Sequence, residues 1–354
     1  MGYTWRKEAG VWKKVSSMYR KESGVWVPVK SGLQKVSGVY VSIFEAEVIV
    51  DITTNQTNLV LKDLFTSDDW TSGKAKTVHI HTGVTVSPTS GAPSWALAPQ
   101  GATETTIWGG TLTLINDGII QGMGGAANSG VGGNALYVGT VSNGTKKLQI
   151  KNNGTIRSGG GGGGKGGNGG GGQYNYTATE GPYYVRSGTE YYWQIPGSSG
   201  TGNAILVWGD GTVTSTLDKS ATSFVSGTYT YYRGTYQGTD ASSGINRDYY
   251  SIYRQYTATA NTSGGTGGNG GRGQGADGAN ASGTAGAGGG TNAGTGGTGG
   301  TGGTWGNSGA VGFTGSSGNR TAGTAGTAGG AAGYAYSTVL HNIVTPGIIL
   351  GRVA

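Results

Sequence analysis

Short stretches of the chain alternate apolar and polar residues with a period of two, which is typical of half-buried β-strands. The pattern is clear in residues 39–52 (VYVSIFEAEVIVDI) and in residues 77–86 (TVHIHTGVTV). LTLINDGIIQGMGG, which begins at Leu112, is echoed by LQIKNNGTIRSGGG, which begins at Leu148, 36 residues later. Each reads as a strand, an Asn-x-Gly hairpin turn, a second strand and a glycine tract. The sequence therefore predicts an all-β fold with a solenoid-like middle made of successive β-rungs.

The N-terminal residues repeat a unit of fourteen residues three times: WRKEAGVWKKVSSM, YRKESGVWVPVKSG and LQKVSGVYVSIFEA. Each unit predicts two short strands joined by a turn, and the three units together predict a β-meander. Residues 1–40 hold eight Lys or Arg against two Glu, which is +6 of the net charge of +7. Such a basic, aromatic module suits nucleic acid. We favour a module whose aromatic residues pack internally and which docks to a larger assembly, with no nucleic-acid partner. The candidate attachment residues are Trp5, Trp12, Tyr19 and Trp26.

Glycine dominates the second half of the chain and contributes 77 of its 354 residues. From Gly294 to Gly318 glycine recurs at every third position, which is the period of a polyproline-II-type helix. Collagen needs abundant proline, and Pro346 is the only proline after Pro196. A flexible linker would not keep this phase over nine glycines. We therefore expect residues 262–334 to form a polyglycine-II bundle whose helices satisfy one another's backbone groups, with GGGGGGKGGNGGGG as one helix of it.

Residues 174–261 interrupt the glycine pattern and are rich in Tyr. Tyr supplies a large contact area at low entropic cost, and Arg pairs with carboxylate or phosphate. The alternating stretch AILVWGDGTVTSTL predicts a hairpin around Gly209–Gly211, so some aromatic residues should form a core and others a binding surface. The candidate contact residues are Tyr183, Tyr184, Tyr191, Tyr192, Trp193, Tyr231, Tyr232, Arg233, Tyr249, Tyr250 and Arg254.

Few residues in the sequence indicate metal binding or catalysis. His79 and His81 share one strand face at metal-ligand spacing, which makes them a weak metal candidate; the sequence indicates no cofactor. A glycan depolymerase would need paired carboxylates, and Glu180, Glu190 and Asp210 are not marked as a pair. There is no cysteine, no apolar run long enough for a membrane span and no signal-peptide pattern at the N-terminus. We expect binding without catalysis, on a protein that leaves its producer cell by lysis or a dedicated route.

The division of the chain that we expect follows these composition changes. It places an attachment module in 1–40, a β-rich domain in 41–120, β-rungs with the first glycine helices in 121–173, the Tyr-rich insert in 174–261, the glycine bundle in 262–334 and a C-terminal strand in 335–354. A homo-oligomer is compatible with this division.

Over residues 105–340, the turns that lead into glycine tracts and the glycine motifs separated by aromatic inserts resemble the glycine-rich tip adhesins of T-even-like phage tail fibres. The resemblance implies a virion protein in which a sandwich of polyglycine-II helices displays loops that bind a host surface protein or glycan. Residues 1–40 would then bind other tail-fibre proteins, although the fourteen-residue repeats depart from the family's pattern. The alternatives are a structural glycine-rich virion protein, for which the insert is dispensable, and a depolymerase, which releases sugar.

Overall fold

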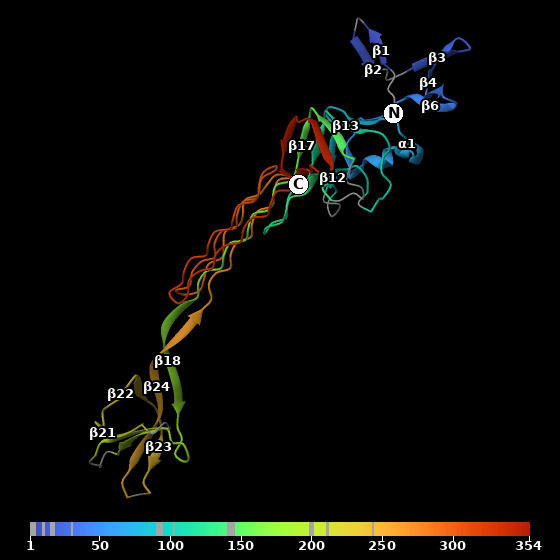
Figure 1. The fold of residues 1–354 in the computed structure, drawn as a ribbon. Helices are drawn as coiled ribbons and strands as arrows, with labels where there is room; N and C mark the ends of the chain where they lie inside the picture. Colours follow the sequence, from blue (N-terminus) through green and yellow to red (C-terminus); the bar gives the residue numbers. More distant parts are fainter. Residues whose placement is uncertain are drawn as a thin grey trace. The chain divides into compact units, whose positions relative to one another are not determined.

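The computed structural model describes residues 5–8, 11–14, 18–29, 31–89, 95–101, 103–139, 146–197, 202–209, 212–242 and 244–354. The described residues are mostly strands and extended segments, with one short α-helix, α1 (Ser67–Thr71), and one 3-10 helix, η1 (Leu61–Leu64) (Figure 1). This confirms the all-β prediction. No helix in the described part of the chain has the length and apolar character that a membrane crossing requires. The chain divides into two compact units, unit 1 (Met1–Gly171 and Ser263–Ala354) and unit 2 (Gly172–Thr262).

The fourteen-residue repeats form three antiparallel hairpins. Their strands are β1 (Trp5–Glu8) with β2 (Val11–Lys14), β3 (Met18–Glu22) with β4 (Val25–Val29), and β5 (Ser31–Val36) with β6 (Val39–Glu45). The repeated Ser-Gly pair makes the second and third turns, where Gly24 and Gly38 have φ of 89° and 87°. In the described residues each hairpin is a separate two-stranded sheet, so the predicted meander is wrong. Lys and Arg along the strands disfavour pairing from edge to edge.

Three parallel sheets build the β-solenoid of unit 1. The first contains β7 (Val48–Ile52), β10 (Lys76–Ile80), β13 (Leu112–Asn116), β16 (Leu148–Asn152) and β26 (His341–Thr345). The second contains β8 (Gln56–Thr57), β11 (Thr85–Ser87), β14 (Ile119–Gln121), β17 (Thr155–Arg157) and β27 (Ile348–Leu350). The third contains β9 (Leu59–Val60), β12 (Trp95–Ala98) and β15 (Asn134–Leu136). Each of the first three circuits of the chain adds one strand to every sheet, around a core that includes Leu114 and Ile150.

The two Asn-x-Gly turns are corners of this solenoid and not hairpins, which corrects the sequence interpretation. β13 pairs with β10 and β16 in one sheet, while β14, directly after the turn, pairs with β11 and β17 in another. The first Asn of each turn points inward, where Nδ2 of Asn116 donates to Oδ1 of Asn152 at 2.7 Å. Both side chains are fully buried. The buried asparagine side chains therefore hydrogen-bond one rung to the next, and the local turn preference of Asn-x-Gly does not predict this role.

The glycine-rich residues are inserted into one circuit of the solenoid. The chain leaves at the end of β17 and returns at β25 (Tyr334–Tyr336), where the N–H of Tyr334 donates to Oδ1 of Asn134 at 2.8 Å beside β15. β25 pairs with β28 (Arg352–Val353), and β26 and β27 complete the first two sheets. Residues 335–354 therefore hold four strands that close the solenoid, and not the single C-terminal strand that we expected.

Residues 159–171 form the centre of the glycine-rich part of unit 1. Their N–H groups donate to residues 265–274 and 307–316 at every third position, as in the bonds from Gly163, Gly166 and Gly169 to Gly271, Gly268 and Gly265. The acceptors in residues 265–274 descend as the donors ascend, so this segment runs antiparallel to residues 159–171. Figure 1 shows the glycine segments side by side. A Cβ added at Gly166 would lie 2.0 Å from the carbonyl oxygen of Gly297. The contact is therefore between backbones.

Glycine occupies the positions of each segment at which a Cβ would meet another backbone. Residues 159–171 contact several segments, and only Lys165 and Asn168 carry side chains there; both are exposed. Residues 295–303 repeat Thr-Gly-Gly, with both glycines facing neighbours. Residues 321–329 repeat Thr-Ala-Gly, with one glycine in three against residues 309–315. The same residues also meet the central segment through threonine, since the N–H groups of Thr324 and Thr327 donate to the carbonyls of Asn168 and Lys165, so glycine is required only where a Cβ would enter the contact.

Unit 2 is a seven-stranded antiparallel sheet. Its strands are β18 (Gly172–Tyr183), β19 (Tyr192–Pro196), β20 (Ala204–Trp208), β21 (Thr212–Leu217), β22 (Ser223–Ser226), β23 (Tyr229–Asp240) and β24 (Arg247–Thr262). The start of β18 pairs with the end of β24, where Gly172 lies opposite Thr262. β20 and β21 are antiparallel neighbours as AILVWGDGTVTSTL predicts, with Asp210 and Gly211 outside the described residues.

Candidate functional site

The sheet of unit 2 has one face packed on a core and one open face. Ile252 of β24 is fully buried in a core with Trp193 and Trp208. Because successive side chains of a strand point to opposite faces, Ser251 and Tyr253 lie on the other side. We call this side the outer face and define it by Tyr192, Tyr232, Tyr249, Ser251 and Tyr253.

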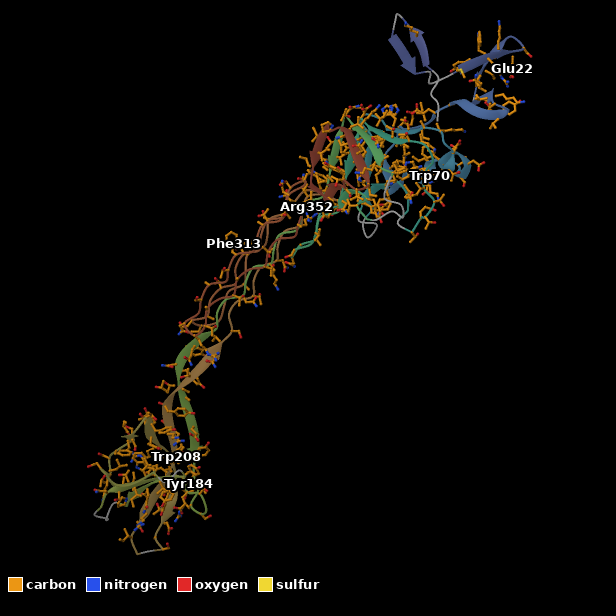
Figure 2. All side chains as sticks on the ribbon, in the orientation of Figure 1. Glu22, Trp70, Tyr184, Trp208, Phe313 and Arg352 are labelled. Carbon is orange, nitrogen blue, oxygen red and sulfur yellow. The ribbon has the colours of Figure 1, made fainter. Side chains whose placement is uncertain are left out.

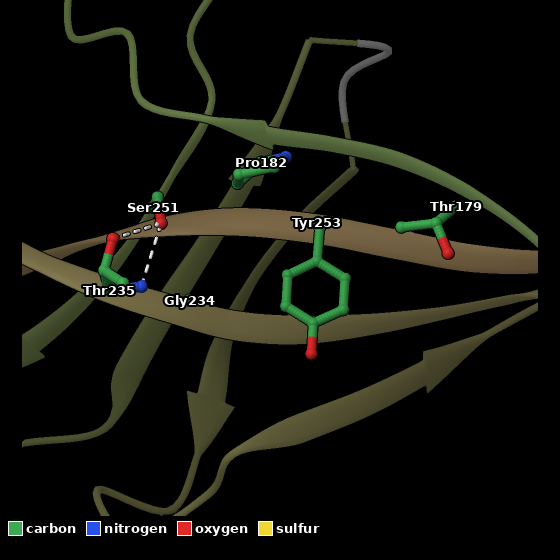
Figure 3. Close-up of a pocket in the computed structure, with 6 residues that line it drawn as sticks. All are labelled: Thr179, Pro182, Gly234, Thr235, Ser251 and Tyr253. Carbon is green, nitrogen blue, oxygen red and sulfur yellow. Dashed lines mark hydrogen bonds between the residues drawn. The ribbon is translucent and has the colours of Figure 1, made fainter.

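A hollow of about 290 Å³ opens on the outer face (Figure 3), lined by Thr179, Pro182, Gly234, Thr235, Ser251 and Tyr253. Oγ of Ser251 accepts a hydrogen bond from the N–H of Thr235 at 2.9 Å and lies 3.2 Å from Oγ1 of Thr235. A Cβ at Gly234 would lie 2.3 Å from that same Oγ, so glycine keeps β23 close to β24. With the hydroxyl groups of Ser251 and Thr235 engaged, the hollow offers mainly carbon surface and the ring of Tyr253.

Aromatic residues flank the hollow along the outer face. The rings of Tyr232 and Tyr253 stack with their centroids 5.0 Å apart and their planes 12° from parallel. Both are half-buried, so one part of each ring stays accessible. Stacked rings are rigid and present a flat apolar edge, a surface suited to a sugar ring or an apolar side chain.

A second cluster surrounds Tyr249 on the same face. The guanidinium of Arg186 lies 4.0 Å from the ring centroid of Tyr249 and is paired with Asp240. The hydrogen bond that Arg186 donates to Asp240 raises the pKa of Arg186, and the N–H of Ser242 together with Arg186 holds the pKa of Asp240 well below its usual range. Tyr184, labelled in Figure 2, and Tyr192 pack edge-on against Tyr249 at 6.4 and 5.3 Å. Burial raises the pKa of Tyr192, which keeps its hydroxyl protonated.

Three of the predicted contact residues are buried, two in the core and the third, Tyr249, on the outer face beneath Arg186, which corrects the sequence interpretation. Trp193, Tyr231 and Tyr249 are only 0%, 1% and 7% exposed. The side chain of Arg254 is 12% exposed, because it pairs with Glu180 at 2.8 Å and lies over the rings of Trp208 and Tyr229. These four side chains hold the sheet together and have little surface for a ligand.

The remaining predicted residues divide between the faces. Tyr184, Tyr192 and Tyr232 belong to the outer face, whereas Tyr191, Arg233 and Tyr250 pack towards the core side and are half-buried. Tyr183 is 39% exposed at the core edge, with its ring 5.0 Å from Tyr191 and 5.7 Å from Trp208.

The prediction chose neighbouring Tyr pairs and missed Tyr253 and the small residues of the hollow. Neighbours on a strand face opposite ways, so the alternation in RDYYSIYRQY already carries the signal that separates Tyr249 and Tyr253 from Tyr250.

The histidine pair has a partner that the sequence did not suggest. His79 and His81 stack with their ring centroids 4.1 Å apart, and Asp51 on the neighbouring strand joins them. Asp117 lies on the other side of His79, and its pKa is lowered by hydrogen bonds from Asn153 and His79. Only the parallel register of β7 with β10 brings Asp51 to this place.

Two of the candidate attachment residues are on the surface of their hairpin. Tyr19 and Trp26 are 58% and 65% exposed, so the expectation that they pack internally is wrong. A two-stranded hairpin has no second layer that could cover them. Leu33 and Tyr40 in the third hairpin are exposed as well. The side chains of Trp5 and Trp12 lie outside the described residues.

The chain is similar to proteins of phage tail fibres. Among solved structures, the crystal structure of the gp37-gp38 adhesin tip complex of the bacteriophage S16 long tail fiber matches with 15% sequence identity and a TM-score of 0.30. The match covers 88% of this chain and 83% of that one. No curated protein sequence matches the chain. The model of the family described as phage tail fibre adhesin Gp38 matches residues 47–245, which is more than half of the chain. The chain therefore belongs to the phage tail fibre adhesin Gp38 family.

Proposed function

We propose that the outer face of unit 2 is the surface with which this tail fibre adhesin binds its receptor on the host cell. The observation that carries the proposal is the hollow beside the stacked rings of Tyr232 and Tyr253. Aromatic and Arg side chains dominate binding hot spots when they surround an apolar pocket. On this face Tyr253 lines the hollow and Tyr232 stacks on it, and neither ring belongs to the core.

The charges on the outer face suit a host protein loop or a glycan. Arg186 and Arg247 bring two cations to the face; Arg186 is already paired with Asp240, and Arg247 can donate to the side-chain oxygen of Gln194. Cations that are partly satisfied contribute hydrogen bonds to a ligand without an unpaired charge in the free state. Carbohydrate and protein ligands share this chemistry of ring stacking with polar contacts at the edge.

We propose binding without catalysis. Of the three carboxylates considered from the sequence, Glu180 is held by Arg254 at 2.8 Å, Glu190 is hydrogen-bonded with Tyr192, and Asp210 lies outside the described residues. A glycosidase needs one carboxylate free as the acid and another as the base or nucleophile across the scissile bond. Asp240, which is paired with Arg186, is likewise not free for either role.

The other parts would position this face. We propose that the period-three glycine segments are polyglycine-II helices, which form a stiff support because each backbone is bonded to its neighbours. We propose that the three N-terminal hairpins bind another tail-fibre protein on the virion tail through exposed Tyr19 and Trp26. Isolated hairpins of this size are marginal in water, so a partner that covers them would stabilise them.

The test compares the binding of two purified proteins, the wild-type chain and the Tyr232→Ala/Tyr253→Ala variant, to host cells. The unfolding transition of the variant checks that it is folded. We expect affinity to fall roughly thirtyfold or more, since truncating a hot spot costs about 2 kcal/mol. Tyr176→Ala, at a tyrosine 46% exposed in β18 and outside the hollow lining, is the matched control and should bind normally. Unchanged binding by the folded double variant refutes the assignment, and soluble sugar released from host glycan by the wild-type chain refutes binding without catalysis.

A further inference from the structure

Two strands of the first solenoid sheet bring three potential metal ligands together on its outer surface. Asp51 of β7 and His79 of β10 are register partners, and His81 follows β10, with its N–H donating to the carbonyl of Ile52 at 3.1 Å. The alternating neighbours Val78 and Ile80 are fully buried, so the two histidines point away from the core. Their side chains are 26% and 42% exposed, and that of Asp51 is 55% exposed.

The donor atoms are close enough to share one ion. Oδ1 of Asp51 lies 2.8 Å from Nε2 of His81 and 3.6 Å from Nδ1 of His79. One donor from each of the three residues lies within 4.8 Å of the others. Ligands held about 2.1 Å from a tetrahedral zinc ion stand roughly 3.4 Å apart. The observed distances lie on either side of this value, so small side-chain rotations would complete the geometry.

A second layer of residues orients His79. Its Nε2 lies 2.6 Å from Oδ2 of Asp117, and Oδ1 of Asp117 accepts from Nδ2 of Asn153 at 2.8 Å. A carboxylate partner requires a proton on Nε2, which leaves the lone pair of a neutral ring on Nδ1, facing the Asp51 carboxylate. Two electron-rich atoms face each other there unless a cation lies between them. Histidine ligands of metals commonly have this carboxylate support.

We propose that Asp51, His79 and His81 bind a divalent transition metal ion of the zinc type, with Asp117 and Asn153 as positioning residues. Two imidazole nitrogens and one carboxylate oxygen are the donor set that such ions take, and three protein ligands leave a fourth position for water. The ion would tie β7 to β10 at the surface of the solenoid. The competing explanation is a doubly protonated His79 between two carboxylates, with no metal.

Titration calorimetry with ZnCl₂ and the visible spectrum of added Co²⁺, on the full chain without an affinity tag, test the site. We expect one ion per chain, a visible Co²⁺ band of nitrogen and oxygen ligation and a higher melting temperature with zinc. Asp51→Asn and His81→Gln should abolish these three signals. Asp117→Asn should weaken affinity roughly tenfold to a hundredfold, the usual cost of losing such support.

The matched control is Asp68→Asn, an exposed carboxylate on α1 that is not among the three ligands. It should bind zinc as the wild type does, which shows that a lost surface charge is not the cause. The absence of zinc and Co²⁺ binding by the folded wild-type chain overturns the proposal. Equal binding by the folded Asp51→Asn and His81→Gln variants overturns it too, because the ion would then lie elsewhere.

Discussion

The solenoid and the glycine segments are held together in different ways. In the solenoid, the side chains of Leu114 and Ile150, on neighbouring strands, are fully buried and fill the space between the sheets. In the glycine segments, no side chain occupies the centre, and the N–H and carbonyl groups of residues 159–171 bond directly to the segments around them. Buried apolar side chains therefore hold the solenoid together, whereas hydrogen bonds between closely spaced backbones hold the glycine segments together.

The difference predicts how each region tolerates substitution. A core side chain can be trimmed at the cost of a cavity, and the surrounding residues partly relax around it. A backbone contact line cannot accept even one methyl group, since both sides are peptide groups already bonded to each other. Conversely, ordering so many glycines costs conformational entropy, which the dense bonding between segments must offset.

The largest effect should come from Gly166→Val in the central segment. The first carbon of the side chain would lie 2.0 Å from the oxygen and 2.6 Å from the carbonyl carbon of Gly297. We expect destabilisation well above the 1–3 kcal/mol typical of overpacking, because backbone cannot move aside. The measurement is thermal unfolding together with proteolysis across residues 263–333. Lys165→Ala, at the exposed neighbouring position, is the control and should stay near the wild type.

Two other glycines should be sensitive for different reasons. Gly303→Val would bring a carbon 2.2 Å from the oxygen of Asn307, a clash between segments. Gly306 has φ of 71° in a turn, so Gly306→Val is opposed by backbone strain as well as by the N–H of Gly351 at 2.5 Å. Thr298 and Thr301 are exposed, and alanine there should be mild. Equal stability of all four variants would contradict the contact-line explanation.

Leu114→Ala should cost about 2–5 kcal/mol, the range for buried leucines. Leu114 is fully buried, and Ile115, the next residue of the strand, points the other way and is partly exposed. Ile115→Ala is thus a matched control that removes a similar volume from the opposite face. Chemical denaturation of the two variants checks the prediction, and a larger loss for Ile115→Ala would reverse our assignment of the solenoid interior.

His341 should make the solenoid sensitive to acid. It is buried in β26, and burial lowers its pKa to about 4, against about 6.5 when unfolded. The unfolded chain then binds one more proton between these values, so stability falls as pH drops from about 6.5 to about 4, by on the order of 3 kcal/mol. Unfolding measured across this pH range should show the loss. His341→Leu should flatten it, and an unchanged pH profile in that variant would assign the effect to other groups.

Phe313→Ser should have the smallest effect. Phe313 is 66% exposed, and Figure 2 shows its side chain pointing away from the glycine segments. Its backbone N–H donates to the carbonyl of Thr298, and serine keeps that bond. We expect the free energy of unfolding, measured by chemical denaturation, to change by no more than about 0.5 kcal/mol, as for ordinary surface positions. A loss comparable to that of Leu114→Ala would show that aromatic side chains and not backbone bonds hold this segment.

The candidate site was foreseen as a region and less well as a set of residues. Dense Tyr and Arg indicated residues 174–261, but Trp193 and Tyr231 are core residues, Tyr249 is buried on the outer face, and Tyr253 was missed. Exposure on a strand depends on which face the neighbouring strands cover, and that depends on pairing between residues far apart in the chain. Asp51 was missed for the same reason, because it meets His79 only through parallel register.

The sequence by itself determined the all-β class, the repeated Ser-Gly turns and the period-three glycine tract, because these follow from local backbone preference and residue spacing. Only the tertiary structure decided that the Asn-x-Gly turns are solenoid corners and that the glycine segments leave and re-enter one circuit between β17 and β25. It also decided that residues 159–171 are central. A hairpin and a corner use the same turn residues, and a glycine segment at the centre has the same local preference as one at the edge. They differ only in the backbones that lie beside them, and these come from elsewhere in the chain.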